Sequence, residues 1–227
     1  NIGFVSRMTR GKPWVRLKTA STLDGVTALE NGVSQWITGP AARRDGHRWR
    51  ARACAVLSGI GTVIEDDPSL TVREVDTPRQ PLRIIVDARL QLTPQARLFA
   101  DIERSPLLVV CASDDTPKAR ALRDAGAELL VLPNEGGKVD LPAMFQALGA
   151  RGLNEVHAES GHKLNGSLMR EGCVDELLMY LAPTLLGRGM GLFNLGPFDT
   201  LAQRIDLDIR DMRAVGRDWR VLARPRA

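Results

Sequence analysis

The chain alternates between short apolar runs and longer segments in which apolar residues recur at helical spacing. The apolar runs cover residues 54–58, 83–87, 106–112 and 128–132. Such continuous runs are typical of strands that are covered on both faces, as in a parallel sheet. The segments with helix signals cover residues 40–53, 117–125 and 140–148. Strands that alternate with helices predict an α/β fold with a mainly parallel central sheet flanked by helices.

The two ends of the chain carry other strand patterns. Residues 13–20 alternate, so Arg16 and Lys18 are expected on the face opposite Leu17. Residues 174–182 form a long apolar run, which we interpret as a strand at an exposed sheet edge. Residues 205–223 predict an antiparallel C-terminal hairpin. Because no repeat or linker interrupts the chain, we predict a single domain over residues 1–227.

Residues 155–169 combine a short strand, a glycine turn and the start of a helix. Gly161 permits the sharp turn, and backbone N–H groups at a helix start attract phosphate. Glu159 falls at the carboxyl end of the strand, where open α/β sheets place their ligands. The stretch is not a P-loop, since Ser167 stands where lysine is required, and it is not a GxGxxG motif. From this stretch alone, a phosphate site and a simple packing turn both remain open.

Charge and composition favour a small anionic ligand. The net charge is +4, and arginines scattered along the chain carry most of the positive charge. Aromatic residues make up only 4%, which leaves few platforms on which single-stranded nucleic acid could stack. No apolar run is long enough to cross a bilayer. Scattered cysteines without a CxxC pair indicate small core residues in a reducing compartment, so a cytoplasmic protein is expected.

Two short patterns raise the question of a metal. His157-Ala-Glu159 is one half of the zinc deaminase signature, but the PCxxC half is absent, so no metal site is predicted. The run Glu65-Asp-Asp-Pro68 follows a glycine turn, and its plain interpretation is a solvated turn. If the neighbouring strands are parallel, Thr62 and Asp66 would lie at the same sheet edge as Glu159.

Several motifs, in a fixed order, cover nearly the whole chain. They are Lys18-Thr-Ala-Ser-Thr-Leu-Asp-Gly25, Ser34-Gln-Trp-Ile-Thr38, Gly59-Ile-Gly-Thr-Val63, Asp66-Asp-Pro-Ser-Leu-Thr-Val-Arg73, Glu159-Ser-Gly161 and Val174-Asp-Glu-Leu177. As a set they resemble the reductase domain of the bifunctional riboflavin biosynthesis deaminase/reductase. The resemblance implies a dihydrofolate-reductase-like fold. It also implies the NADPH-dependent reduction of 5-amino-6-(5-phosphoribosylamino)uracil to the ribitylamino product, with hydride transfer to C1 of the ribose.

The resemblance assigns roles to individual residues. It implies catalytic roles for Lys18, Asp66 and Glu159. The implied substrate contacts are Lys18, Ser34, Arg50, Leu70, Arg73 and Glu159. The implied cofactor contacts are Ala20, Trp36, Thr62, Asp66 and Ala88, with a phosphate cradle formed by Gly161, His162, Lys163, Leu164, Asn165, Gly166 and Ser167. The arginines suit a phosphomonoester, and Leu70 would pack on the uracil.

Two positions depart from the pattern of the family, because Ser160 replaces a glycine or alanine and Ala88 replaces a serine that touches the cofactor. The resemblance therefore gives less support to a cofactor contact at Ala88. The neighbouring Arg89 is our candidate for binding the 2′-phosphate of NADPH, and a solvent-exposed arginine without that role remains the alternative.

Two other functions remain open. One is a dihydrofolate-reductase-like enzyme that reduces another pterin or ribosylamino substrate. The other is an inactive nucleotide-binding module, although the presence of Lys18, Asp66 and Glu159 argues against it. In the family a zinc deaminase domain precedes the reductase on the same polypeptide, so residues 1–12 are interpreted as a linker remnant. Relatives associate through this domain, and we predict at least a homodimer that pairs through residues 174–182.

Overall fold

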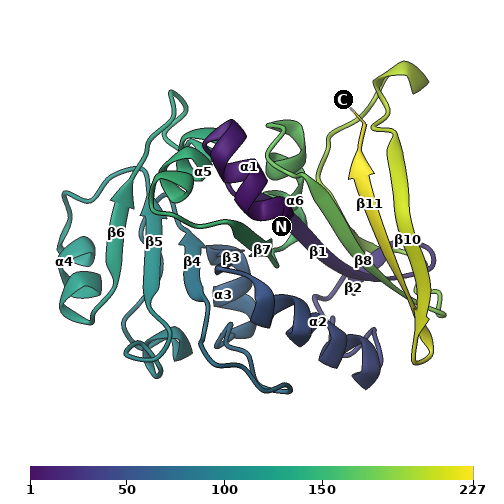
Figure 1. Cartoon of the computed structure of the whole chain (residues 1–227), viewed down its shortest axis with the longest axis horizontal. Helices are drawn as coiled ribbons and strands as arrows, with labels where there is room; N and C mark the ends of the chain where they lie inside the picture. The colour runs from purple at the N-terminus through teal and green to yellow at the C-terminus, as the bar shows by residue number, and fades with distance from the viewer. Residues whose placement is uncertain (227) are drawn as a thin grey trace. The chain divides into compact units, whose positions relative to one another are not determined.

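A computed structural model describes residues 1–226 of the chain, which folds into two compact units. Unit 1 contains residues 1–14 and 47–159. Unit 2 contains residues 15–46 and the C-terminal part of the chain from Ser160. Each unit is made from two separate stretches of sequence (Figure 1). The prediction of a single domain stays a prediction.

Unit 1 is built on a parallel sheet of five strands. In order across the sheet they are β7 (Glu155–Ala158), β3 (Ala55–Gly59), β4 (Leu82–Val86), β5 (Leu107–Cys111) and β6 (Glu128–Val131). Leu57 pairs with Ala158 on one side, and Ser58 pairs with Ile85 on the other. Because the strands are parallel, the residues that follow β3, β4 and β7 emerge at the same edge of the sheet.

Six helical segments belong wholly or partly to unit 1. They are α1 (Ile2–Arg10), the end of α2 (Pro40–Arg52), α3 (Ile60–Asp66), η1 (Arg97–Phe99), α4 (Pro117–Asp124) and α5 (Leu141–Ala150). The sequence predicted α2, α4 and α5, but residues 60–66 were expected to form a turn. This segment is a helix that follows β3 directly, with Gly59 at its N-cap and Asp67 in the left-handed conformation at its C-cap.

Residues 1–12, interpreted above as a linker remnant, contain helix α1, and that interpretation stays a prediction. The Asn1 side chain caps helix α1, and Gly11 ends it in the left-handed conformation, with a φ of 70°. Ser6 is buried, and its hydroxyl donates a hydrogen bond to the Lys12 carbonyl. The helix also approaches Asn154 closely, because a Cβ built on Gly3 would lie 2.5 Å from the Asn154 carbonyl oxygen. Helix α1 is therefore packed against the body of unit 1.

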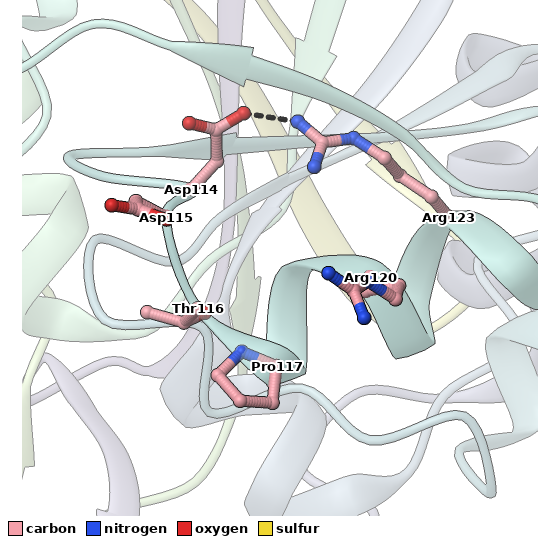
Figure 2. Close-up of a pocket in the computed structure, with 6 residues that line it drawn as sticks. All are labelled: Asp114, Asp115, Thr116, Pro117, Arg120 and Arg123. Atoms are coloured by element: carbon pink, nitrogen blue, oxygen red, sulfur yellow. Dashed lines mark hydrogen bonds and ion pairs between the residues drawn. The ribbon is translucent and has the colours of Figure 1, made fainter.

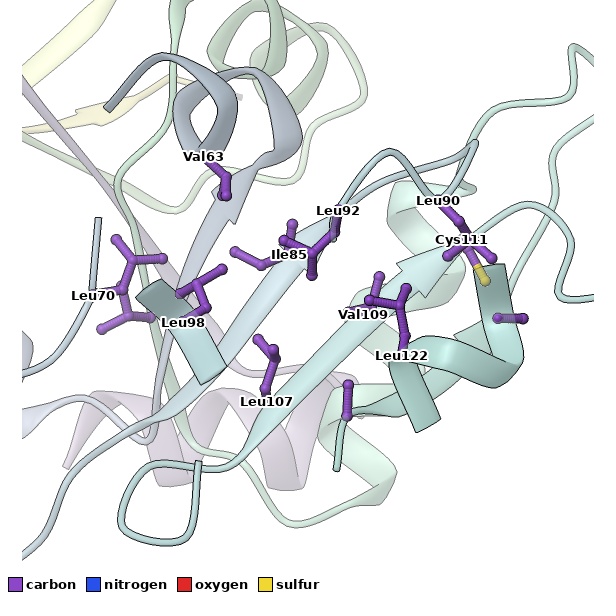
Figure 3. Packing of buried hydrophobic residues seen from close by; sticks show 13 residues of the cluster. Val63, Leu70, Ile85, Leu90, Leu92, Leu98, Leu107, Val109, Cys111 and Leu122 are labelled. Atoms are coloured by element: carbon purple, nitrogen blue, oxygen red, sulfur yellow. The ribbon is translucent and has the colours of Figure 1, made fainter. Parts of the chain in front are cut away.

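The hydrophobic core of unit 1 lies against β3, β4 and β5 (Figure 3). Val56, Ile85 and Val109 contribute from the strands, and Leu122 from α4. Cys111 is buried in the same cluster, as predicted for a small core residue. Leu70 also belongs to this cluster, although it lies in a loop and carries a positive φ of 53°.

Unit 2 contains a mixed sheet with antiparallel strands at its C-terminal end. In order across the sheet, its strands are β10 (Leu207–Val215), β11 (Asp218–Pro225), β8 (Glu176–Ala182) and β1 (Trp14–Thr22). Strands β1 and β8 are parallel, whereas β11 is antiparallel to both β8 and β10. The remaining elements are β2 (Val26–Leu29), β9 (Gly189–Gly191), helix α6 (His162–Arg170) and η2 (Leu201–Gln203). The predicted parallel sheet and the C-terminal hairpin are both confirmed.

Two details of unit 2 bear on the predicted strands. Arg16 was expected on the face of β1 opposite Leu17, and on that face it is buried and pairs with Glu176 at 2.7 Å. Strand β8 was expected at a sheet edge, but it lies between β1 and β11. The strand at the edge is β10, on which Ile209 and Met212 are more than half exposed. A sequence pattern cannot distinguish a buried strand from an edge strand when both are apolar.

Candidate functional site

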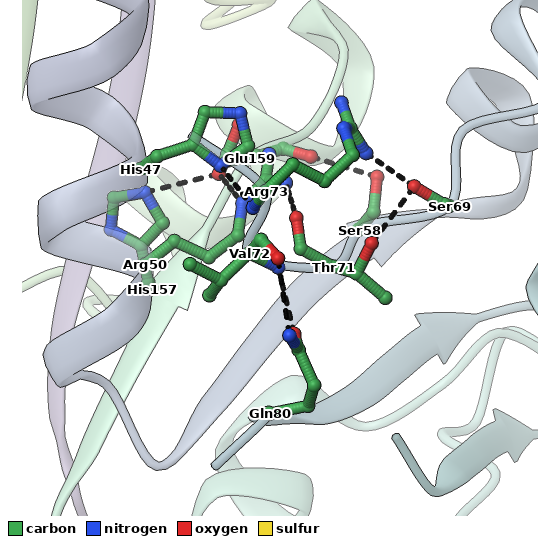
Figure 4. A network of polar contacts seen from close by, with 10 residues as sticks. All are labelled: His47, Arg50, Ser58, Ser69, Thr71, Val72, Arg73, Gln80, His157 and Glu159. Carbon is green, nitrogen blue, oxygen red and sulfur yellow. Dashed lines mark hydrogen bonds and ion pairs between the residues drawn. The ribbon is translucent and has the colours of Figure 1, made fainter. Parts of the chain in front are cut away.

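Polar side chains gather where β3 and β7 end, at the carboxyl edge of the unit 1 sheet (Figure 4). We call this group the Glu159 cluster; it consists of His47, Arg50, Ser58, Ser69, Thr71, Arg73, His157 and Glu159. The backbone of Glu159 is fixed to β3, because its N–H donates to the Leu57 carbonyl at 2.8 Å. The Ser58 hydroxyl donates to the Glu159 carbonyl at 2.7 Å. The carboxylate therefore extends from a fixed backbone position.

Two side chains contact the same oxygen of the Glu159 carboxylate. Arg50 Nε donates to Oε1 at 2.9 Å, and His157 Nε2 lies 3.2 Å from that oxygen. The Glu159 side chain is 17% exposed, whereas that of His157 is 0% exposed. Arg50, on α2, also donates from Nη1 to the Thr71 carbonyl at 2.6 Å. Arg50 thus links the carboxylate to the loop that follows Pro68.

Residues 69–73 form a loop without regular secondary structure, yet side chains from elsewhere in the unit hold it. The buried Arg83 donates to the Ser69 carbonyl at 3.3 Å. Gln80 pairs with both backbone groups of Val72, accepting from its N–H at 2.8 Å and donating to its carbonyl at 3.1 Å. The Arg73 N–H donates to His47 Nδ1 at 3.4 Å. These contacts fix the backbone from which the Arg73 side chain extends.

The Glu159 cluster is rich in positive charge. Burial, followed by the charges of Arg50 and Arg73, lowers the pKa of His47 to about 4. Burial and the nearby Arg50 also lower the pKa of Arg73. Like charges that crowd together in this way are stabilised by an anion. The arrangement therefore favours a ligand with a phosphate or carboxylate group, as the sequence indicated for Arg50 and Arg73.

The other predicted residues of unit 1 lie at the same edge of the sheet. Thr62 and the exposed Asp66 are on α3, directly after β3, and Asp66 is in its last position. The half-buried Ala88 and the exposed Arg89 follow β4. The condition for Thr62 and Asp66 to share an edge with Glu159 is met, because β3 and β7 are parallel neighbours.

The proposed role of the Leu70 side chain does not fit the structure. Leu70 is 4% exposed, and its side chain packs into the hydrophobic core of unit 1 (Figure 3). It is therefore not available to pack on a uracil ring. Leu70 also has a positive φ, a backbone conformation that its sequence context does not predict.

The predicted residues of unit 2 lie on strand β1, in the segment between β2 and α2, and at the start of helix α6. Lys18 and Ala20 are half-buried positions of β1 that alternate with the buried Leu17 and Thr19, so they share one face. Ser34 and Trp36 lie in the segment between β2 and α2. Trp36 is 70% exposed, and the Arg43 guanidinium lies 4.7 Å from the centre of its ring.

Helix α6 begins without a side-chain cap, since its N-cap residue is the exposed Gly161. The first amide with a partner inside the helix is that of Asn165, which donates to the Gly161 carbonyl at 3.0 Å. Lys163 is exposed, whereas His162, Leu164 and Ser167 are half-buried. A helix start with this geometry suits a phosphate group.

Two residues of the predicted phosphate cradle face the protein instead. The buried Asn165 accepts from the Ser160 hydroxyl at 2.7 Å and donates to the Leu192 carbonyl at 3.0 Å. A Cβ on Gly166 would lie 2.0 Å from the Asn194 carbonyl oxygen. These two residues therefore hold the start of α6 against residues 192–194, and their side-chain positions do not point to a ligand.

A separate cavity of about 320 Å³ lies at the end of β5 and the start of α4 (Figure 2). Its lining residues are Asp114, Asp115, Thr116, Pro117, Arg120 and Arg123. None of the predicted site residues lines it. Arg123 pairs with Asp114, and the two carboxylates balance the two guanidinium groups, so the cavity has no marked preference for an anion or a cation.

Within residues 1–226, no cluster of three or more histidine, cysteine, aspartate or glutamate residues has an arrangement suited to a metal ion. In the same part of the chain, no helix is both long enough and apolar enough to span a membrane. The sequence predicted no site role for the cluster residues His47 and His157, or for Gln80, which holds the backbone of Val72. The two-residue spacing of His157 and Glu159 did place them on one face.

Comparisons with known proteins identify relatives over the whole chain. Residues 13–221 match the family model described as the RibD C-terminal domain. The riboflavin biosynthesis protein RibD of Escherichia coli (strain K12) is 37% identical, and the match covers 96% of this chain and 61% of that protein. The chain therefore spans less than two thirds of the length of this relative.

Solved structures of riboflavin biosynthesis proteins also match this chain. Acinetobacter baumannii RibD, form 1, superimposes with a TM-score of 0.87 at 35% identity, over 99% of this chain and 61% of that chain. A diaminohydroxyphosphoribosylaminopyrimidine deaminase/5-amino-6-(5-phosphoribosylamino)uracil reductase from Thermotoga maritima matches with a TM-score of 0.83 at 26% identity, covering 99% and 60% of the two chains. At 8% identity, a dihydrofolate reductase from Enterococcus faecalis matches with a TM-score of 0.50 over 96% and 98%. This last likeness concerns the fold alone. On this sequence and structural evidence, the chain belongs to the RibD C-terminal domain family.

Proposed function

We propose that the chain reduces the ribosylamino group of 5-amino-6-(5-phosphoribosylamino)uracil to the ribitylamino product, with NADPH as the reductant. Family membership supports a reductase, and the name of the Thermotoga maritima relative specifies this substrate. The observation that carries the proposal is the Glu159 cluster, in which a carboxylate and arginines meet at the carboxyl edge of a parallel sheet.

Arg73 is the residue of the cluster best placed to bind the phosphate of such a substrate. Its side chain is exposed, and its guanidinium donates to the Ser69 hydroxyl. Arg50 already donates hydrogen bonds to Glu159 and to the Thr71 carbonyl, so it would contribute to phosphate binding mainly through its positive charge. A guanidinium presents several N–H groups in one plane, which suits the oxygens of a phosphomonoester.

The proposed reaction needs a proton as well as a hydride. The bond between C1 and the ring oxygen of the ribose breaks, C1 gains a hydride, and the ring oxygen gains a proton. A carboxylate beside C1 would stabilise the positive charge that develops there and would take part in the proton transfer. Glu159 and Asp66 are the candidates, because both lie at the edge of the unit 1 sheet.

The residues of the chain suit a dinucleotide cofactor. NADPH, when bound, supplies the hydride. The start of α6 offers backbone N–H groups for its phosphates, because no side chain caps that helix. In unit 1, Thr62, Ala88 and Arg89 follow the adjacent strands β3 and β4, and the family resemblance expects cofactor contacts at these residues.

The direct test is NADPH oxidation by the purified chain, measured with the ribosylaminopyrimidine and, separately, with dihydrofolate. We expect turnover with the first substrate only. Turnover with dihydrofolate alone would replace this proposal with the pterin alternative, and no turnover with either would support a non-catalytic module.

Variants test the two carboxylates. Asp66→Asn or Glu159→Gln should lower turnover about tenfold or more, the low end for lost acid–base or electrostatic assistance. The exposed Glu65 is next to Asp66 on α3, so Glu65→Gln is a matched control that should keep normal turnover. Near-normal kinetics for both carboxylate variants would contradict the catalytic roles. A change confined to the Michaelis constant would instead indicate binding of a ribose hydroxyl.

A further inference from the structure

His157 is an unusual residue for its position. It lies in β7, pairs in register with Val56 of β3, and its side chain is 0% exposed. Its neighbours Val156 and Ala158 are both fully buried apolar residues. Burying an imidazole costs free energy unless a polar partner compensates. The partner on the same face is Glu159, whose Oε1 lies 3.2 Å from His157 Nε2.

The contacts of Glu159 show what the histidine contributes. Its backbone is fixed through Leu57 and Ser58, but the side chain can still rotate about its own bonds. Arg50 contacts Oε1 from α2, and His157 contacts the same oxygen from β7. Contacts from two elements to one oxygen restrict rotation of the carboxylate more than either contact does alone.

We propose that His157 is a positioning residue that holds the Glu159 carboxylate in its working orientation. The inference rests on the proposed function, since Glu159 is there a residue that acts on the substrate. Because the His157 side chain is fully buried, we assign it no contact with substrate or cofactor. Its effect passes through Glu159 alone, which makes it separable from a general contribution to stability.

Steady-state kinetics of two substitutions test this role. His157→Leu replaces the imidazole with an apolar side chain of similar volume and removes the contact with Glu159 Oε1. We expect kcat to fall about tenfold, the effect of a modest misplacement of a reacting group, while KM changes less than about twofold. His157→Gln can place an amide nitrogen near the position of Nε2 and should restore kcat to within about threefold of normal.

A double-mutant cycle distinguishes positioning from damage to the fold. In a Glu159→Ala background the carboxylate is gone, so His157→Leu should cause no further loss of kcat. Val156→Ala opens a cavity in the same strand without removing a contact to Glu159. It should lower the melting temperature and leave kcat within about twofold of normal. Equal losses from His157→Leu with and without Glu159 would overturn the inference.

A measurement without substrate separates this inference from the proposed function. The chain has three histidines, so ring ¹⁵N spectra are simple, and the His157 signals are identified by their loss in His157→Leu. Glu159→Ala should shift the ring nitrogen signals of His157. Unchanged signals would overturn the inference even if the enzyme is active. If the signals shift but the ribosylaminopyrimidine is not reduced, the contact stands and the proposed function fails.

Discussion

The buried His47 makes the stability of the protein sensitive to moderate acid. Its pKa falls from an ordinary value of 6.5 to about 4 because burial and the charges of Arg50 and Arg73 disfavour the imidazolium. In the unfolded chain the ring titrates near its ordinary pKa, so between these values the unfolded state binds more protons than the folded state. Stability from this group is therefore complete above about pH 6.5 and decreases as the pH falls toward about 4.

The size of the effect follows from the two pKa values. On going from about pH 8 to about pH 5, the difference in proton binding removes about 2 kcal/mol from the free energy of unfolding. The variant His47→Asn keeps an acceptor for the Arg73 N–H, since the Asn Oδ1 lies near the position of Nδ1. The variant does not titrate in this range, and its free energy of unfolding should lose about 2 kcal/mol less over the same interval.

Urea unfolding at a series of pH values, followed by circular dichroism, measures this difference. Buffers without phosphate or sulfate are required, because anions that bind near Arg73 would mask the effect. His162→Gln, which removes a half-buried histidine of unit 2, is the control for loss of a histidine elsewhere in the chain. If wild-type protein and His47→Asn lose the same free energy between the two pH values, then His47 is not the group responsible.

Four other predictions are simpler to test. Gly166→Ala should destabilise the chain by roughly 1–3 kcal/mol, as overpacking does, because the added Cβ meets the Asn194 carbonyl. In the control Gly61→Ala the added Cβ meets no atom within 4 Å, so this variant should not be destabilised. Equal melting temperatures for the two variants would contradict the prediction. Arg89→Ala should weaken NADPH binding on the order of tenfold and leave NADH almost unaffected, and an equal loss for both would exclude Arg89 as the reader of the 2′-phosphate. Light scattering at micromolar concentration should give a mass of at least a dimer. Met212→Asp, on the edge strand β10, should weaken this association. A monomer mass for the wild-type chain would refute self-association. Because the PCxxC half of the deaminase signature is absent, metal analysis should find less than one zinc ion per chain.

The sequence predicted the order of the elements in unit 1 because parallel strands produce continuous apolar runs with clear ends. It also placed Glu159, Thr62 and Asp66 at one sheet edge, which requires only the strand ends and their direction. The burial of Leu70 was not predictable, because this residue lies in a loop and has no strand or helix pattern around it.

The buried polar residues were harder to predict than the strands. Arg83 lies at the start of the predicted apolar strand 83–87, and it is fully buried, with the carbonyls of Ser69 and Ser105 as its partners. Such contacts join residues that are far apart in the sequence and have no periodic pattern. The position of β8 inside the sheet was misjudged for a similar reason, since its neighbour β11 lies at the far end of the chain.

The anchoring of residues 69–73 has a consequence for binding. Because Arg83, Arg50, Gln80 and His47 already hold this backbone, ordering it on ligand binding costs little conformational entropy. The loop is preorganised without belonging to any helix or strand. The anchors at positions 72 and 73 contact backbone atoms, and the Arg73 guanidinium adds one side-chain contact inside the loop by donating to the Ser69 hydroxyl. An engineer who wishes to change the anion that is recognised can therefore vary Arg73 while keeping the frame that presents it.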